Sequence, residues 1–162
     1  MLISLDHLVA KYGIKFSGIL HVGAHECEEL EVYNKYVSSD KILWVEALPE
    51  KVTYCKSKIP NLLIENAIVS NRVENITFYR SNNGQSSSIL ELGTHQMLYP
   101  GIVYTSSFQA ETQLLDNIIS KYPAIKFNFL NMDIQGAELK ADRKSTRLNS
   151  SHEWISRMPS SA

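Results

Sequence analysis

Short apolar runs alternate with stretches of mixed polarity along the first 70 residues. The apolar runs Gly18–Val22, Lys41–Val45 and Leu62–Val69 predict strands. The stretches between them, Glu26–Val37 and Pro49–Ile59, predict helices, and proline suits the opening position of the second. Each predicted strand is almost continuously apolar, which is typical of a parallel sheet covered on both faces. The order strand-helix-strand-helix-strand therefore predicts the α/β fold class, a parallel sheet with helices on both faces.

The rest of the chain is less regular. Ile76–Arg80 alternates as a half-buried strand does, and Ser81–Ser88 is a polar loop with an Asn-Gly turn signal. Thr112–Ser120 predicts a helix and Phe127–Met132 a fourth buried strand, after which Ile134–Lys140 begins another loop and helix. Two further stretches complete the pattern. A short amphipathic helix is predicted at the N-terminus from Leu2, Ile3, Leu5, Leu8 and Val9, and Thr94–Pro100 remains ambiguous.

The alternation of apolar and polar positions stops near Ala141. Residues 142–162 have no strand or helix period and are rich in serine, as in a disordered tail. The stretch DRKSTRLNSSH is also what one reading frame of a common sequencing-library adapter encodes, and SRMPSSA resembles a further part of that adapter. We therefore expect one domain over residues 1–141, incomplete at its C-terminus, and a non-native or disordered tail over residues 142–162.

Charge and composition exclude several kinds of partner. A net charge of -1 gives no electrostatic case for a nucleic acid or an anionic membrane. No apolar run approaches the roughly 18 residues needed to span a bilayer. The N-terminus also lacks the pattern of a signal peptide. Cys27 and Cys55 make no disulfide framework, so we expect a cytoplasmic protein with reduced thiols.

Candidate ligand-binding residues follow three predicted strands. In an open parallel sheet, ligands bind beyond the carboxyl ends of the strands. Gly23 and Ala24 follow the first strand, where a glycine lets the backbone approach a ligand and a helix N-terminus can aim N–H groups at an anion. Glu46 ends the second strand and can accept hydrogen bonds from ribose hydroxyls. Asp133 and Gln135 follow the fourth strand and can face the same crevice, although an Asp there can also cap the next helix.

These residues leave the class of protein open. A strand-end glutamate is common to NAD-binding and S-adenosylmethionine-binding folds, so a nicotinamide-dependent oxidoreductase is an alternative, as is a non-catalytic nucleotide-binding module. The single glycine in HVGAH argues against the oxidoreductase, because a dinucleotide needs close backbone approach to its pyrophosphate. His21, His25 and Cys27 do not have the spacing of a standard zinc site, so we expect no metal.

Five segments in order resemble the FkbM family of methyltransferases. They are GILHVGAHECEELEVY, ILWVEALPE, ENAIVSN, ITFYRSNNGQSSSIL and FNFLNMDIQGAELK, and the resemblance covers nearly all of residues 15–141. It implies a Rossmann-like class I methyltransferase fold with S-adenosyl-L-methionine as the methyl donor. It also implies methylation of an oxygen on a small molecule or sugar.

The resemblance also implies roles by position. Gly23 and His25 would line the amino-acid end of the cofactor, Glu46 would hold the ribose, Asn66 and Ala67 would lie near the adenine, and Asp133 would lie beside the reacting methyl group. The full set of expected cofactor-binding residues is His21, Gly23, Ala24, His25, Glu46, Asn66, Ala67 and Asp133. The expected substrate-binding residues are Ser87, Ser88 and Gln135. His21 stands where many relatives have an acidic residue, and Cys27 stands where a glycine is frequent.

Methyl transfer to a hydroxyl requires a base. Asp133 and His25 are both candidates, and the sequence does not separate them. A complete sheet of this family has seven strands, as the resemblance implies, whereas this chain supplies four main strands and an insertion. We therefore expect the polypeptide as written to be poorly soluble and inactive, because its fourth strand would present an apolar edge.

Overall fold

The computed structural model of this protein describes residues 4–84, 86–89, 101–135, 137–138 and 141. The sequence-based predictions for Leu2, Ile3, Thr94–Pro100 and residues 142–162 concern residues outside this described part. The helices are α1 (Leu5–Tyr12), α2 (Leu30–Tyr33), the short 3-10 helix η1 (Ser39–Lys41), α3 (Pro49–Lys58) and α5 (Leu115–Ile119). The strands are β1 (Ile19–Val22), β2 (Ile42–Glu46), β3 (Ile64–Asn66), β4 (Ile68–Val69), β5 (Asn75–Ser81), β6 (Tyr104–Gln113) and β7 (Phe129–Met132).

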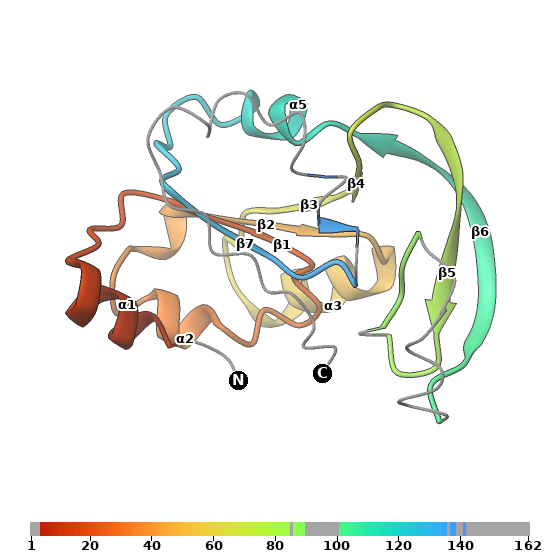
Figure 1. Ribbon diagram of the computed structural model, residues 1–162, viewed down its shortest axis with the longest axis horizontal. Coiled ribbons are helices and arrows are strands. Elements are labelled where there is room, and N and C mark those ends of the chain that lie inside the picture. Colours follow the sequence, from red (N-terminus) through yellow and green to blue (C-terminus); the bar gives the residue numbers. More distant parts are fainter. Residues whose placement is uncertain (1–3, 85, 90–100, 136, 139–140, 142–162) are drawn as a thin grey trace.

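The centre of the molecule is a parallel sheet with the strand order β3-β2-β1-β7 (Figure 1). Leu20 of β1 lies between Leu43 of β2 and Leu130 of β7 in register. The predicted α/β architecture with a parallel sheet is therefore confirmed. Because the strands are parallel, the residues that follow β1, β2 and β7 all emerge at one edge of this sheet.

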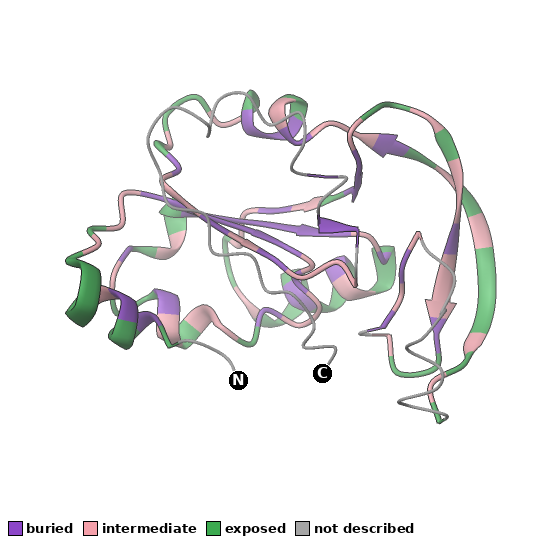
Figure 2. Cartoon of the chain, in the orientation of Figure 1, coloured by how far each residue is buried: buried purple, intermediate pink, exposed green. Residues whose placement is uncertain are grey.

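Helices cover both faces of the parallel sheet, as predicted. On one face, Leu20 and Val22 pack in a buried cluster with Leu115 and Ile118 of α5. On the other face, Ile19 joins a cluster with residues of α1, α2 and α3. Figure 2 shows the strands of this sheet as largely buried along their length. Burial of both faces explains why β1 and β2 are continuous apolar runs in the sequence.

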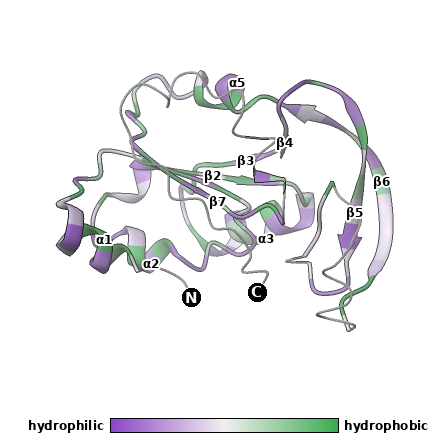
Figure 3. Ribbon diagram, viewed as in Figure 1, coloured by the Kyte–Doolittle hydropathy of each residue, from purple (hydrophilic) through white to green (hydrophobic). Residues whose placement is uncertain are grey.

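A second sheet, with the strand order β4-β6-β5, lies beside the first (Figure 1). β5 and β6 pair antiparallel, and β4 pairs parallel with the end of β6. β5 corresponds to the predicted strand Ile76–Arg80, whereas β6 was not predicted. Most of its side chains are polar and lie outside the core, so its hydropathy is mixed, in contrast with the apolar central strands (Figure 3).

Two predicted elements change sheet or type at their ends. The predicted strand Leu62–Val69 is divided at Ala67, so β3 stays in the parallel sheet and β4 joins the second sheet. The Ala67 N–H donates to the carbonyl of Glu46, which marks the last contact with the parallel sheet. The predicted helix Thr112–Ser120 was also too long, because Thr112 and Gln113 pair in β6 and α5 begins at Leu115.

The predicted helix Glu26–Val37 is largely wrong. Only Leu30–Tyr33 forms the α-helix α2, and turns precede it. His25 and Cys27 have φ values of 45° and 59°, in the left-handed region that cannot continue a right-handed helix. The predicted N-terminal helix is found as α1, whose first turn is capped by the Ser4 side chain accepting from the His7 N–H.

Among the described residues, no helix combines the length and the apolar character required to cross a membrane.

Candidate functional site

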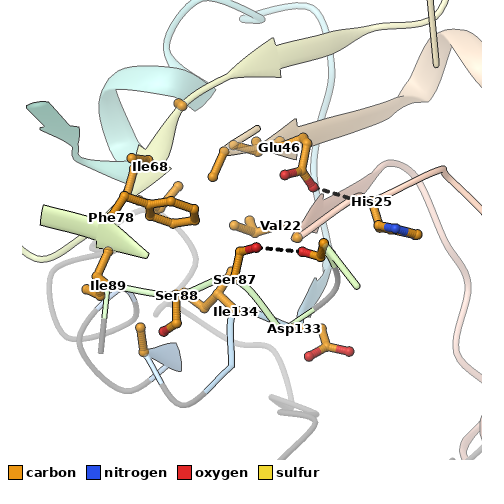
Figure 4. A pocket seen from close by; sticks show the side chains of 17 residues that line it. Val22, His25, Glu46, Ile68, Phe78, Ser87, Ser88, Ile89, Asp133 and Ile134 are labelled. Atoms are coloured by element: carbon orange, nitrogen blue, oxygen red, sulfur yellow. Dashed lines mark hydrogen bonds between the residues drawn. The ribbon is translucent and has the colours of Figure 1, made fainter. Parts of the chain in front are cut away.

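A pocket lies at the carboxyl edge of the parallel sheet, between this sheet and the second one. Its lining residues surround about 570 Å³ of space, which includes the part that is open to solvent. Gly23, Glu46 and Asp133, which follow three different strands, all line it. Across from them, Ile68, Phe78 and Ile89 form an apolar wall (Figure 4). The structure therefore brings together the three strand-end residues that the sequence singled out.

Gly23 is required by the protein's own backbone. Its φ is 91°, and a Cβ at this position would lie 1.9 Å from the carbonyl oxygen of Asp133. The Asp133 N–H in turn donates to the carbonyl of Val22 at 2.9 Å. The sequence predicts that this glycine allows close approach of a ligand, but the space beside it is occupied by the Asp133 carbonyl, directly after β7.

The turn after β1 offers no set of free backbone donors. The N–H groups of Gly23 and Ala24 both donate to the carbonyl of Val45, at 2.9 and 3.1 Å. The His25 N–H donates to Glu46 Oε2, and the next N–H donates to a side-chain carboxylate within the same turn. The expected helix N-terminus that aims free N–H groups at an anion is therefore absent from this turn, because α2 begins only at Leu30.

Glu46 joins the two turns that flank the pocket. Its side chain is 8% exposed. Oε2 accepts from the His25 N–H at 2.7 Å and Oε1 accepts from the Leu48 N–H at 2.8 Å. Burial raises the pKa of Glu46, although the two backbone donors act in the opposite direction. Each carboxylate oxygen has a second lone pair, so Glu46 can still accept hydrogen bonds from a ligand in the pocket.

His25 is held by its backbone and by one ring nitrogen. Its Nδ1 lies 2.6 Å from Glu28 Oε1, and its carbonyl accepts a hydrogen bond from the Cys55 thiol at 3.3 Å. Burial opposes ionisation of Glu28, but the hydrogen bond from His25, the nearby His25 charge and backbone N–H donors together outweigh it, so the pKa of Glu28 is lowered. Nε2 is buried and has no hydrogen-bond partner among the described residues. A Cβ placed on Gly84 would lie 3.9 Å from this nitrogen.

Asp133 lines the pocket and is oriented by its neighbour. Its Oδ1 accepts from the Gln135 side-chain amide at 3.1 Å. Gln135 has a φ of 56° and does not line the pocket, so its side chain acts on Asp133 from outside. The N–H of Ile134 donates to Glu138 Oε1 at 2.9 Å, so Glu138 satisfies this donor in place of Asp133.

Ser87 and Ser88 line the pocket, but their hydroxyl groups bond within the protein. Ser87 Oγ donates to the Gly84 carbonyl at 2.8 Å and accepts from the Ser81 N–H. Ser88 is 4% exposed, and its Oγ donates to the Gln135 carbonyl at 3.3 Å. Both serines thus fix the loop after β5 against the pocket.

Three of the expected cofactor residues do not line the pocket. His21 is fully buried on the opposite face of the sheet, where its ring stacks on Trp44 at 4.7 Å and its Nδ1 lies 2.9 Å from the Tyr33 hydroxyl. Its side chain is part of the core because alternate residues of β1 point to opposite faces. Ala24 is likewise buried in the cluster on that face.

The third of these, Asn66, is exposed and supports the pocket only from behind. Its side-chain amide donates to the carbonyls of Glu46 and Ala47, at 2.9 and 3.0 Å. Ala67, the next residue, does line the pocket.

Several pocket features were missed in the sequence. The apolar wall of Ile68 and Phe78 comes from the second sheet, and Phe78 occupies a buried position in an alternating strand that was recognised only as half-buried. Glu28 was missed because its contact with His25 depends on the left-handed turn, which the residue pattern does not reveal. Among the described residues, no three His, Cys, Asp or Glu side chains form a group that can hold a metal ion.

Comparisons with known proteins identify one family. A family model described as the methyltransferase FkbM domain matches residues 21–141. No curated protein and no solved structure matches the chain. The match begins within β1 and includes the strand ends that form the pocket. Because it covers well over half of the chain, this protein belongs to the FkbM methyltransferase family.

Proposed function

We propose that this domain uses S-adenosyl-L-methionine to methylate a hydroxyl group of a small molecule or sugar. The observation that carries the proposal is the pocket at the carboxyl edge of a parallel sheet, which is lined both by the buried Glu46 and by an apolar wall (Figure 4). The strand order β3-β2-β1-β7 supports a Rossmann-like class I fold, in which nucleotides bind at this edge.

The two ends of the pocket suit the two ends of an adenosyl group. Glu46 has acceptor capacity left for a ribose hydroxyl, because its backbone donors do not use all the lone pairs of its two oxygens. Ala67, Ile68 and Phe78 offer apolar surface to a flat base. Asn66 would then hold the strand end from behind without touching the base, in contrast with its expected role.

The chemistry divides between the cofactor and the protein. The bound cofactor supplies an electrophilic methyl group on a sulfonium. The protein's part is to hold the acceptor oxygen in line with that group and to take up the hydroxyl proton. Asp133 and His25 both line the pocket and are the candidate bases. Cys27 and Cys55 are free thiols, which supports a cytoplasmic enzyme.

The nicotinamide alternative gains no support at the turn after β1. A dinucleotide pyrophosphate needs backbone N–H donors there. The N–H groups of Gly23, Ala24 and His25 are all engaged within the protein.

Isothermal titration of the 162-residue chain with S-adenosyl-L-methionine, S-adenosyl-L-homocysteine and NAD tests the proposal. We expect the two adenosyl compounds to bind and NAD not to bind. Glu46→Gln should weaken their binding by about 10- to 100-fold, because a hydrogen bond to a charged group contributes roughly 1.5–3 kcal/mol. Glu65→Gln is the matched control, since Glu65 lies on the neighbouring strand β3, pairs with Lys121 and does not line the pocket. Equal affinities for the two variants, or preferential binding of NAD, would contradict the proposal.

A further inference from the structure

His25 stands in a strained conformation that several contacts maintain. Its φ of 45° is uncommon for a residue with a side chain. The His25 N–H is held by Glu46 Oε2, and its carbonyl is held by the thiol of Cys55. Backbone strain of this kind clusters at functional sites. The fold thus fixes the direction of this imidazole from both sides of the residue.

The ring of His25 is also fixed in its protonation pattern. Glu28 Oε1 lies 2.6 Å from Nδ1, and an ionised carboxylate only accepts hydrogen bonds. Nδ1 must therefore carry a proton, which leaves the lone pair of the neutral imidazole on Nε2. Glu28 Oε2 accepts from the Glu26 N–H at 3.2 Å, so the carboxylate itself has a defined position.

Nε2 is the one polar atom of His25 that the described protein leaves unsatisfied. A buried nitrogen without a partner is costly, so it marks a site where another molecule supplies the missing donor. Gly84 lies over it, and the absent side chain of this glycine leaves a gap bounded by Nε2 and by Cε of Lys51. In Figure 4 the Glu46 carboxylate is joined by a hydrogen bond to the backbone of His25, and the imidazole extends from there to the outer side of the labelled pocket residues.

We propose that Glu28 is a positioning residue that makes His25 Nε2 the base for the acceptor hydroxyl. The inference rests on the proposed function. If the adenosyl group fills the interior beside Glu46, the acceptor has to approach from the rim, where His25 lies under the Gly84 turn.

In the proposed step, a methyl group moves from the cofactor to the acceptor hydroxyl while His25 takes up a proton. The hydroxyl proton of the acceptor moves to Nε2, and an oxygen lone pair forms the new bond to the methyl carbon. The carbon–sulfur bond breaks, and its electron pair stays on sulfur, which becomes a neutral thioether. The positive charge thus passes from sulfur to the imidazolium, where the Glu28 carboxylate stabilises it.

The charged and titratable groups near His25 come from three elements. Glu28 and Glu26 lie on its own turn, Glu46 contributes from β2, and Lys51 and Cys55 contribute from α3. Lys51 is paired with Glu26, so its charge is partly neutralised.

Nitrogen-15 NMR of the histidine rings in the full chain tests the proposal without measuring turnover. We expect the neutral His25 ring to carry its proton on Nδ1. Glu28→Ala should mix the two tautomers, whereas Glu31→Ala, an exposed carboxylate on α2, should leave them unchanged. With S-adenosyl-L-homocysteine bound, added glycerol, used as a hydroxyl probe, should shift the Nε2 resonance. A proton on Nε2 in the unaltered protein, an Nε2 resonance indifferent to glycerol, or a spectrum without the dispersion of a folded protein would each overturn the proposal.

Two further measurements separate this inference from its alternatives. Glu28→Ala should bind S-adenosyl-L-homocysteine within about twofold of the unaltered protein, because Glu28 does not line the pocket. If neither Glu28→Ala nor the unaltered protein bound S-adenosyl-L-homocysteine, the proposed function would be refuted. The tautomer of His25 would still be measured by NMR without the ligand. His25→Asn, which tolerates the left-handed conformation, should not lower the melting temperature. A clear fall would indicate that His25 serves the fold and would overturn the proposed role.

Discussion

The two ends of the pocket are built in different ways. At the parallel sheet, Gly23, His25 and Glu46 are fixed by backbone hydrogen bonds and by left-handed conformations. At the second sheet, the strands of Ile68 and Phe78 pair with β6, and the two side chains are held by packing in a small apolar cluster. The first end depends on backbone geometry and tolerates almost no change. The second depends on side-chain volume and can accept other apolar residues of similar size.

Gly23→Ala should have the largest effect. The added methyl group would collide with the Asp133 carbonyl, and φ of 91° is unfavourable for alanine. We expect a loss of about 4 kcal/mol in the free energy of unfolding, close to the whole stability of a small domain. Urea denaturation measures it, with Gly13→Ala as the control, since this glycine also has a positive φ but nothing within 4 Å of its Cβ position. Similar losses in both variants would show that the collision is relieved cheaply.

Phe78→Ala should follow at the other end of the pocket. Phe78 is 5% exposed, contacts the ring of Phe108 and lines the pocket. Removing a buried phenylalanine side chain costs about 3 kcal/mol, and affinity for the adenosyl compounds should fall as well. Phe78→Leu, which keeps most of the volume, should recover the larger part of both quantities. If the leucine variant is as impaired as the alanine variant, the second end also requires exact geometry.

Ser88→Ala sharpens the comparison, because Ser88 connects the two ends. Its hydroxyl donates to the carbonyl of Gln135, next to the pocket residue Asp133. We expect a loss of about 1 kcal/mol in unfolding free energy, the usual contribution of one hydrogen bond. Ser106→Ala on the exposed part of β6 serves as the control and should change nothing measurable. The prediction fails if the two substitutions are indistinguishable.

The smallest effect concerns pH. Burial raises the pKa of Glu46, so the folded state holds a proton over a range where the unfolded state has lost it. The contribution of Glu46 to stability is therefore present below the unfolded pKa and is lost as pH rises through the raised, folded pKa. The contribution of Glu65 to stability changes with pH in the opposite direction. Burial alone would raise the pKa of Glu65, but hydrogen bonds from Lys121 and Tyr122 lower it, so this contribution is lost on acidification.

Thermal melts of Glu46→Gln and Glu65→Gln between pH 4 and 8 test these signs. Relative to the unaltered protein, the melting temperature of Glu46→Gln should be highest at the upper end of this range. That of Glu65→Gln should be highest at the lower end. Parallel curves for both variants would show that neither carboxylate titrates as described.

The sequence predicted the parallel sheet because burial on both faces leaves an unbroken apolar run, as in Ile42–Val45. It failed at β6, because only alternate residues such as Phe108 and Ala110 touch a core there, and polar residues separate them. The sequence predicts a single strand over Leu62–Val69 because apolar residues stand on both sides of Ala67. Only pairing reveals that the chain changes sheets at this residue.

The candidate site could be predicted in part for a similar reason. Gly23, Glu46 and Asp133 meet because the ends of parallel strands share one edge, and this follows from the strand order alone. Glu28 and the exclusion of His21 could not be foreseen. The first depends on the left-handed backbone of His25, and the second depends on which face of β1 points toward the pocket.

The single residue between β3 and β4 has a mechanical consequence. Since Ala67 alone spans the two sheets at the pocket wall, they cannot hinge apart there as two domains on a long linker can. On this side of the pocket, a bound molecule therefore meets a cleft whose width is set by the single residue Ala67. If the pocket holds an adenosyl group as proposed, selectivity for its adenine would arise from the fixed width of this cleft. Admitting a bulkier nucleoside would then require a longer chain at Ala67.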